Sequence, residues 1–275
     1  MYFRYRTKFL KKFQSVTNMI TLDVLWAAAL GYLLGSIPIA WIVVKLWLKI
    51  DIRTVGSKNV GGRNVIRAFQ HMEKPKGLAY TVGLIEAILD MLKGFFAMWL
   101  AVWISFTYSQ QDIWVIAFAG PAAILGHNWC IWLWGPGGKG VASTIGTMIF
   151  FNPIFMPMWL VLYFILGSAV MYSAITYLVS FIVMGVIFLF WGGVGNWSWT
   201  TVAVPIVDNT TLEGFSSLYG GILGEFGWAA FAAMMAITLI VLSRQGENFR
   251  KIKTGEAKKM KLWKIFKGKA DEALK

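Results

Sequence analysis

Long apolar segments with very few charges dominate this chain of 275 residues. Several windows of about 20 residues carry almost no charge, and a helix of that length can span a hydrocarbon core of about 30 Å. Over the whole chain 57% of the residues are hydrophobic and 14% are charged, whereas soluble domains carry about 25% charged residues. Because so much apolar surface needs a partner other than water, the sequence predicts an all-α integral membrane protein.

The apolar segments predict seven transmembrane helices, at about 22–47, 78–107, 113–134, 139–151, 153–167, 169–191 and 225–243. Two of them, about 139–151 and 153–167, are short, because Asn152-Pro153 divides what would otherwise be one long interrupted helix. Merging these two would place the loop 48–77 and the basic tail on opposite sides of the membrane. Seven spans keep both on the same side, as the positive-inside rule requires.

Within the first span, Pro38 is expected to bend the helix. Gly31 and Gly35 lie four residues apart in "GYLLGSIP" and predict a small-residue face for close contact with another helix.

Two basic regions flank the membrane domain, which is expected to cover 22–243. They are an N-terminal extension, 1–21, and a cytoplasmic tail, 244–275; the loop 192–224, rich in Gly, Ser, Thr, Asn and Trp, is expected on the external side. Seven spans also place 1–21 outside, where it can lie flat on the membrane surface. Topology in a cell (plasma) membrane with an anionic cytoplasmic face explains most of the net charge of +13, apart from that of 1–21, and no nucleic-acid partner is expected.

Two glycine-rich basic loops predict binding of phosphate groups. In "VGSKNVGGRNVIRA", residues 55–68, the glycines permit a concave loop whose amides bind an anion, and Ser57, Asn59 and Arg67 add side-chain donors. In "GPGGKGVASTIG", Lys139 directly precedes a predicted helix N-terminus, which favours anions. The alternatives are a loop that only fixes membrane topology and a structural turn.

A third group of polar residues lies inside a predicted span. Glu86, Asp90 and Lys93 are spaced four and three residues apart in "GLIEAILDMLKG" and therefore share one helical face. One interpretation is an interior ion pair that fixes helix packing. The other directs Lys93 into a polar cavity, with Asp90 holding it in position and keeping it charged.

The sequence contains no pattern of cysteine and histidine that is typical of a metal or cofactor site. Cys130 is the single cysteine, and the two histidines, His71 and His127, form no cluster with metal-ligand spacing. Neither a metal nor a cofactor is expected.

Five ordered motifs give the chain a resemblance. "GSIP", "DIRTVGSKNVGGRNVIRA", "LDMLKGF", "LGHNWCIWLWGPGGKGVAS" and "RQGENFRKIKTGE" occur in the order of the bacterial acyl-phosphate:glycerol-3-phosphate acyltransferase family, which the sequence resembles from about 22 to 256. The resemblance implies a monomeric seven-helix membrane enzyme with its active site facing the cytoplasm. Such an enzyme moves an acyl chain from acyl phosphate to the 1-hydroxyl of glycerol 3-phosphate, giving lysophosphatidate and phosphate.

The resemblance implies that the phosphate pockets are lined by Ser57, Asn59, Arg67, Lys139 and Asn248, and Ser173 matches a further polar position. The motifs and the resemblance together predict the site residues. Catalytic roles fall to Ser57, Lys139 and Asn248. Substrate or phosphate contacts are expected from Asn59, Gly61, Arg67, Lys93, Gly137, Gly138, Gly140, Ser173 and Arg244.

Departures from the family pattern leave alternatives open. Lys58 and Arg63 stand where the family has Gly and Thr, and they are candidates for substrate specificity; Gln245 stands where the tail motif has His. The alternatives are an enzyme that acylates another phosphorylated acceptor, and a non-catalytic binder or carrier of lipid phosphates on the same scaffold.

Overall fold

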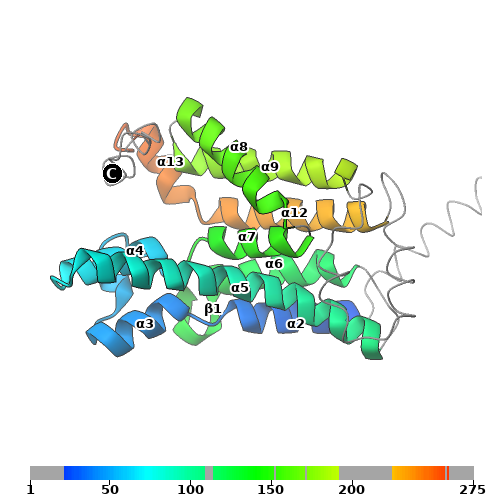
Figure 1. Cartoon of the computed structure of the whole chain (residues 1–275), viewed down its shortest axis with the longest axis horizontal. Helices are drawn as coiled ribbons and strands as arrows, with labels where there is room; N and C mark the ends of the chain where they lie inside the picture. Colours follow the sequence, from blue (N-terminus) through cyan, green and yellow to red (C-terminus); the bar gives the residue numbers. More distant parts are fainter. Residues whose placement is uncertain are drawn as a thin grey trace, which may run out of the picture.

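The computed structural model describes residues 22–108, 114–151, 153–170, 172–191, 225–257 and 259. The predicted extension 1–21, the loop 192–224 and the rest of the tail lie outside the described residues. In the described part of the chain most residues are helical, as the sequence predicts (Figure 1).

The helices run mostly along one direction (Figure 1). In chain order they are α2 (Leu22–Gly35), α3 (Ile39–Leu48), α4 (Gly62–His71), α5 (Lys76–Tyr108), α6 (Val115–Asn128), α7 (Val141–Phe151), α8 (Phe155–Val170), α9 (Ser173–Trp191), α12 (Glu225–Ser243) and α13 (Gly246–Lys253). Two short 3-10 helices, η1 (Ile52–Thr54) and η2 (Ile131–Leu133), lie in the connections.

The first predicted span is broken at Ser36–Pro38. Pro38 has no backbone N–H to continue the helical ladder, so α2 ends at Gly35 and α3 begins at Ile39. The bend expected at Pro38 is therefore a full interruption, and it exposes the Ile37 carbonyl to a side chain from another helix.

Two sequence-based boundaries are wrong. The helix predicted for 113–134 ends at Asn128, because β1 (Trp129–Cys130) pairs antiparallel with β2 (Gly135–Pro136) and turns the chain back. The region 48–77 was predicted as one loop, but it contains α4. That helix forms because Val65, Ala68 and Phe69 are fully buried against neighbouring elements. Their burial stabilises one face of the helix, although the stretch is short and its other residues are polar.

Length and composition identify fewer spans than the seven predicted. Among the described residues, Leu22–Leu48 and Lys76–Ser105 are long and apolar enough to cross a membrane. A third is added if Trp228–Ser243 and Gly246–Lys253, bent by 59°, count as one broken span. The helices from α6 to α9 are apolar but shorter.

Small residues let α2 and α6 approach closely, as expected for Gly31 and Gly35. A Cβ at Gly31 would lie 2.4 Å from the Ala119 carbonyl oxygen, and one at Gly35 would lie 2.0 Å from that of Ala123. No side chain fits in that space, so the two backbones pack directly.

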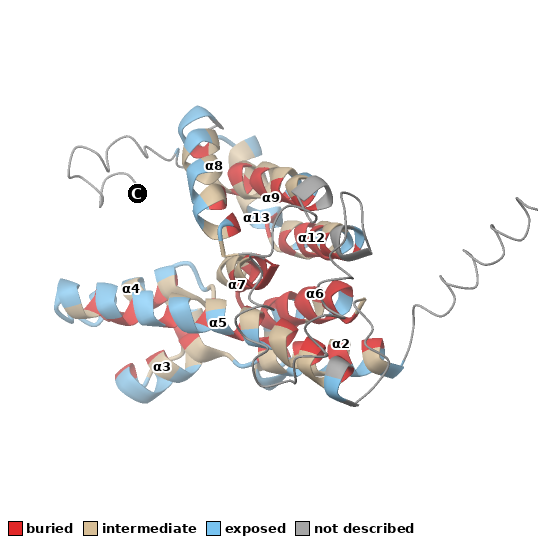
Figure 2. Cartoon of the chain, turned by 45° about the vertical axis from the view of Figure 1, so that its right-hand side comes forward, coloured by how far each residue is buried: buried red, intermediate tan, exposed pale blue. Residues whose placement is uncertain are grey.

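Two hydrophobic clusters make up the core. The larger one joins α2, α5, α6, α7, α8, α9 and α12, and the smaller one lies among α3, α4 and the start of α5. Figure 2 shows buried residues gathered where α6 and α12 face their neighbours, while the outer side of α8 is largely exposed. The polar loops lie at the end of the bundle where α4 and α13 are found (Figure 1).

Candidate functional site

The first loop, 55–61, is held by one buried side chain, Asn64. Its Oδ1 accepts from the Ser57 backbone N–H at 2.8 Å, and its Nδ2 donates to the Ile52 and Val55 carbonyls at 3.0 and 3.1 Å. Gly56 and Lys58 both adopt left-handed backbone conformations, with φ of +56° and +58°. The tight concave loop expected from the glycines is therefore built as much by Asn64, which the sequence analysis missed.

Helix α4 continues directly from this loop. A Cβ at Gly62 would lie 2.7 Å from Oε2 of Glu86, so the start of α4 rests on α5. Arg63 and Arg67 are on the first turns of α4, four residues apart on one face. Burial lowers the pKa of Arg67, and the nearby charge of Arg63 lowers it further, so the two cations lie close together.

The second loop, 137–140, is held mainly by backbone hydrogen bonds. Gly137 N–H donates to the Asn128 carbonyl and Gly138 N–H to the His127 carbonyl, each at 2.9 Å. Gly140 has φ of +77°, which favours glycine. The Gly140 carbonyl then accepts from both the backbone N–H and the hydroxyl of Thr144. Lys139 therefore lies two residues before the start of α7 at Val141.

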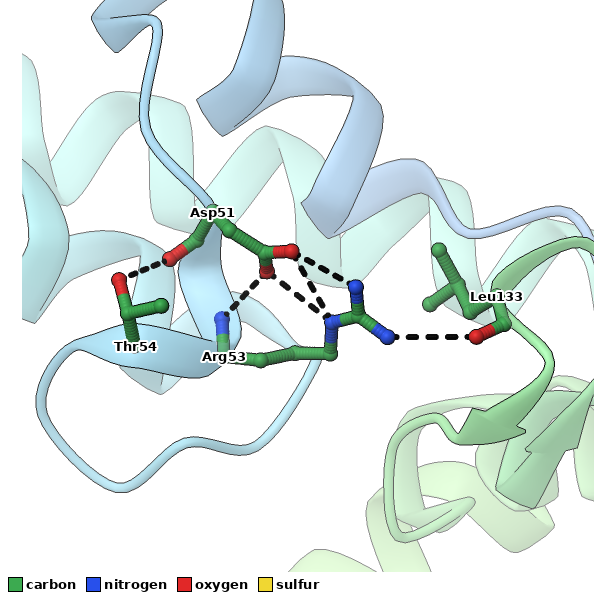
Figure 3. Close-up of polar contacts among 4 residues, drawn as sticks. All are labelled: Asp51, Arg53, Thr54 and Leu133. Carbon is green, nitrogen blue, oxygen red and sulfur yellow. Dashed lines mark hydrogen bonds and ion pairs between the residues drawn. The ribbon is translucent and has the colours of Figure 1, made fainter.

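Arg53 connects the neighbourhoods of the two loops (Figure 3). Its guanidinium pairs with Asp51 at 2.7 Å and donates through Nη1 to the Leu133 carbonyl at 3.2 Å. The hydrogen bond from Arg53 lowers the pKa of Asp51 to about 2. The start of the first loop is thus attached to the ribbon that precedes the second.

The tail brings a third wall. Arg244 donates to the carbonyls of Gly138 and Gly137 at 3.4 and 3.5 Å and lies over the Trp129 ring. Asn248, in α13, donates to Oε1 of the buried Gln245 at 2.6 Å. The end of α12 is therefore fixed on the glycine loop, and α13 projects from that point.

These elements enclose a cavity of about 510 Å³. The predicted residues that line it are Ser57, Asn59, Gly61, Arg63, Arg67, Lys139, Gly140, Ser173 and Asn248. Segments far apart in the sequence thus meet around one cavity, and neither loop sequence by itself indicates that they do.

Five predicted residues do not line this cavity: Lys58, Lys93, Gly137, Gly138 and Arg244. Lys58 is exposed on the loop. Lys93 is buried, 2.9 Å from Asp90 Oδ1, and donates to the Ile37 carbonyl at 3.0 Å. Of the two interpretations of Lys93, the structure favours the interior ion pair. Gly137 and Gly138 are part of the second loop, and Arg244 donates to their carbonyls.

Several lining residues were not selected from the sequence. They include Asn64, Asp90, His127, Tyr172, Tyr177, Gln245 and Lys251. Gln245, Asn248 and Lys251 follow one another at intervals of three residues, which places them on one side of the short tail helix. From Asn248, this spacing predicts that Gln245 and Lys251 face the same cavity. Tyr172 and Tyr177 have no comparable pattern.

The cavity is strongly cationic. Arg63, Arg67, Lys139, Lys251 and Lys259 line it, against Asp90 and Glu256. Burial lowers the pKa of Lys139, and Arg244, Lys251 and Arg63 act in the same direction, while Glu247 opposes them. An anion with more than one charge would relieve this repulsion, so the geometry fits phosphate groups. Among the described residues no three His, Cys, Asp or Glu side chains are grouped to hold a metal ion.

Comparison with known proteins gives one consistent result. The family model described as "Glycerol-3-phosphate acyltransferase" matches residues 25–255. The glycerol-3-phosphate acyltransferase of Helicobacter pylori (strain ATCC 700392 / 26695) is 35% identical over 59% of this chain and 70% of its own length. That of Anaeromyxobacter sp. (strain K) is 32% identical over 84% of this chain and 94% of its own.

A solved structure has the same fold. The crystal structure of PlsY (YgiH), an integral membrane glycerol 3-phosphate acyltransferase, in its glycerol 3-phosphate form is similar with a TM-score of 0.59 and 22% identity, covering 88% of this chain and 98% of that one. On the extent of the family match and of these relatives, the chain belongs to the glycerol-3-phosphate acyltransferase family and is an acyltransferase.

Proposed function

We propose that this protein transfers an acyl chain from acyl phosphate to the 1-hydroxyl of glycerol 3-phosphate, giving lysophosphatidate and inorganic phosphate. The observation that carries the proposal is the convergence of Ser57, Arg67, Lys139 and Asn248 on one cationic cavity of about 510 Å³. Solved forms of PlsY are described with glycerol 3-phosphate and with lysophosphatidic acid, which supports the acceptor and the product.

The acceptor and the donor each carry a phosphate, and the cavity offers two groups of donors for them. Arg67 with Ser57 and Asn59 forms one group, on α4 and the loop before it. Lys139 with the N-terminus of α7 and Asn248 forms the other. A guanidinium fork and a helix N-terminus are both good phosphate ligands.

The reaction needs no base from the protein. The acceptor hydroxyl attacks the acyl carbon, the bond between that carbon and the phosphate oxygen breaks, and the departing phosphate takes the hydroxyl proton. Lys139 stabilises the negative charge that develops on the oxygens during transfer, and the remaining residues hold the two substrates in line.

The proposal extends to the protein's setting. In this proposal the protein is a monomeric, multi-pass protein of the cell membrane, with seven spans and the cavity on the cytoplasmic side. The basic residues of 48–77 and of the tail, which flank the cavity in sequence, support that orientation.

The test is an assay on purified protein in detergent. Palmitoyl phosphate is supplied with and without glycerol 3-phosphate, and phosphate release and lysophosphatidate are measured. Release that depends on glycerol 3-phosphate is the expected result, and the absence of any lysophosphatidate contradicts the proposal.

A second acceptor is favoured by one observation. Arg63, which stands where the family pattern has Thr, lines the cavity and adds a cation there. Phosphate release with a more anionic phosphorylated acceptor, but not with glycerol 3-phosphate, identifies that alternative. Binding without release identifies a carrier.

A further inference from the structure

A buried polar network joins helix α5 to the glycine loop. Lys93 is in contact with the Ile37 carbonyl and with Oδ1 of Asp90. The second oxygen of Asp90, Oδ2, lies 3.6 Å from Nδ1 of His127. Asp90, Lys93 and His127 are at most 8% exposed, so the network lies inside the protein, at the inner wall of the cavity that Asp90 and His127 line.

His127 contacts Gly138 on two sides. Its carbonyl oxygen accepts from the Gly138 N–H at 2.9 Å. Its ring nitrogen Nε2 occupies the space next to the Gly138 Cα, since a Cβ at Gly138 would lie 1.9 Å from it. Gly138 is the residue before Lys139, so the orientation of the imidazole ring bears directly on where Lys139 stands.

The network has little room to move. A residual cavity of about 10 Å³ lies among Asp90, Lys93, His127, Gly137 and Gly138, at or below the space that one water molecule needs. A close-packed interior transmits a displacement to its neighbours and does not absorb it. A change in the ring of His127 will therefore reach the loop.

We infer that Asp90 and His127 are positioning residues, through which α5 fixes Gly138 and thereby the place of Lys139 in the cavity. The inference rests on the proposed function, in which Lys139 stabilises the charge of the transferred group. Asp90 orients the imidazole, Lys93 holds Asp90 against the break between α2 and α3, and the imidazole supports the loop.

The experiment is a double-mutant cycle on the full chain in detergent. His127→Asn removes the ring but keeps the backbone carbonyl and the Asp90–Lys93 pair. It is expected to lower kcat for glycerol 3-phosphate acylation by tenfold to a hundredfold, with KM changed less than threefold, because a misplaced catalytic group costs rate in the transition state. In a Lys139→Ala background the same change is expected to cost less than threefold, because the group it positions is gone.

Ser173→Ala provides the matched control, since Ser173 lines the cavity from α9. In that background His127→Asn should retain its full effect. Equal losses in the Lys139→Ala and Ser173→Ala backgrounds would show a general structural role and overturn the inference, as would an effect of His127→Asn below threefold.

Two further measurements keep the test decisive. If His127→Asn does not elute as a folded protein, Asp90→Asn combined with Lys93→Met replaces it, because both buried charges then disappear together. If the parent protein transfers no acyl group, the proposed function fails, and the same cycle is read from the affinity for inorganic phosphate. A loss of affinity that disappears in the Lys139→Ala background still supports the positioning role, and an undiminished loss refutes it.

Discussion

The two loops that line the cavity both carry glycines and a lysine, but they are built in different ways. The loop 55–61 is held by the side chain of Asn64 and keeps several residues exposed, including Lys58. The loop 137–140 is held by backbone hydrogen bonds, and its Gly137 and Gly138 are buried against His127. Because the loop 55–61 is held from inside by Asn64, its exposed residues can be substituted. In the loop 137–140 the backbone itself is packed against His127, so a larger residue at Gly137 or Gly138 does not fit.

The largest expected difference between the two loops is in the effect on activity of removing the lysine that each one carries. Lys139→Ala should reduce kcat/KM for acyl transfer by about 10²-fold to 10³-fold, equivalent to about 3 kcal/mol of lost transition-state stabilisation. Lys58→Ala, in the first loop, should change it less than threefold, because Lys58 does not line the cavity. The comparison fails if Lys139→Ala stays within tenfold of the parent.

Space gives the next difference. Gly138→Ala should lower the stability by about 3 kcal/mol, at the upper end for overpacking, because its Cβ would meet both His127 and the Val60 carbonyl. Gly61→Ala should be nearly neutral, since Gly61 has an extended backbone and only Asn59 lies near, at 3.4 Å. Thermal unfolding in detergent measures both, and similar melting temperatures for the two variants would contradict the contrast.

The anchor of the first loop comes third. Asn64→Ala removes one accepted and two donated hydrogen bonds at a buried position and should cost about 2 kcal/mol. Asn64→Asp retains the acceptor for Ser57 N–H and loses the donors, so it separates the two contributions. Unchanged unfolding temperatures for Asn64→Ala would mean that the loop does not depend on this side chain.

The smallest effect concerns the link between the loops. The pKa of Asp51 is lowered to about 2 by Arg53, so the pair stabilises the folded state above the unfolded pKa of 3.8. That contribution is lost as the pH falls through about 2. Because both side chains are partly exposed, Asp51→Asn should cost no more than about 1 kcal/mol at pH 7.

Unfolding temperatures of Asp51→Asn and the parent, measured between pH 7 and pH 2.5, check this dependence. The difference should shrink at the acidic end. A constant difference over that range would mean that the charge of Asp51 contributes nothing.

The sequence predicted the helical class, most helix positions and both loops, because apolar periodicity and dense glycine are local features. The sequence did not predict helix α4 or the β-ribbon 129–136, because each depends on the burial of residues such as Val65 and Cys130 against distant segments. Within the site, Lys139 and Arg67 follow from local motifs. Asn64 and His127 do not, because their roles depend on how far their atoms lie from Ser57 and Gly138 in the folded chain.

The walls of the cavity also follow an order in time. They come from the first loop, the glycine loop, α9 and finally α13, which reaches the site through Asn248 and Lys251. A ribosome must therefore make nearly the whole membrane domain before the last wall exists. Until then the growing chain carries its two basic loops without a complete cavity, which exists only when α13 has docked.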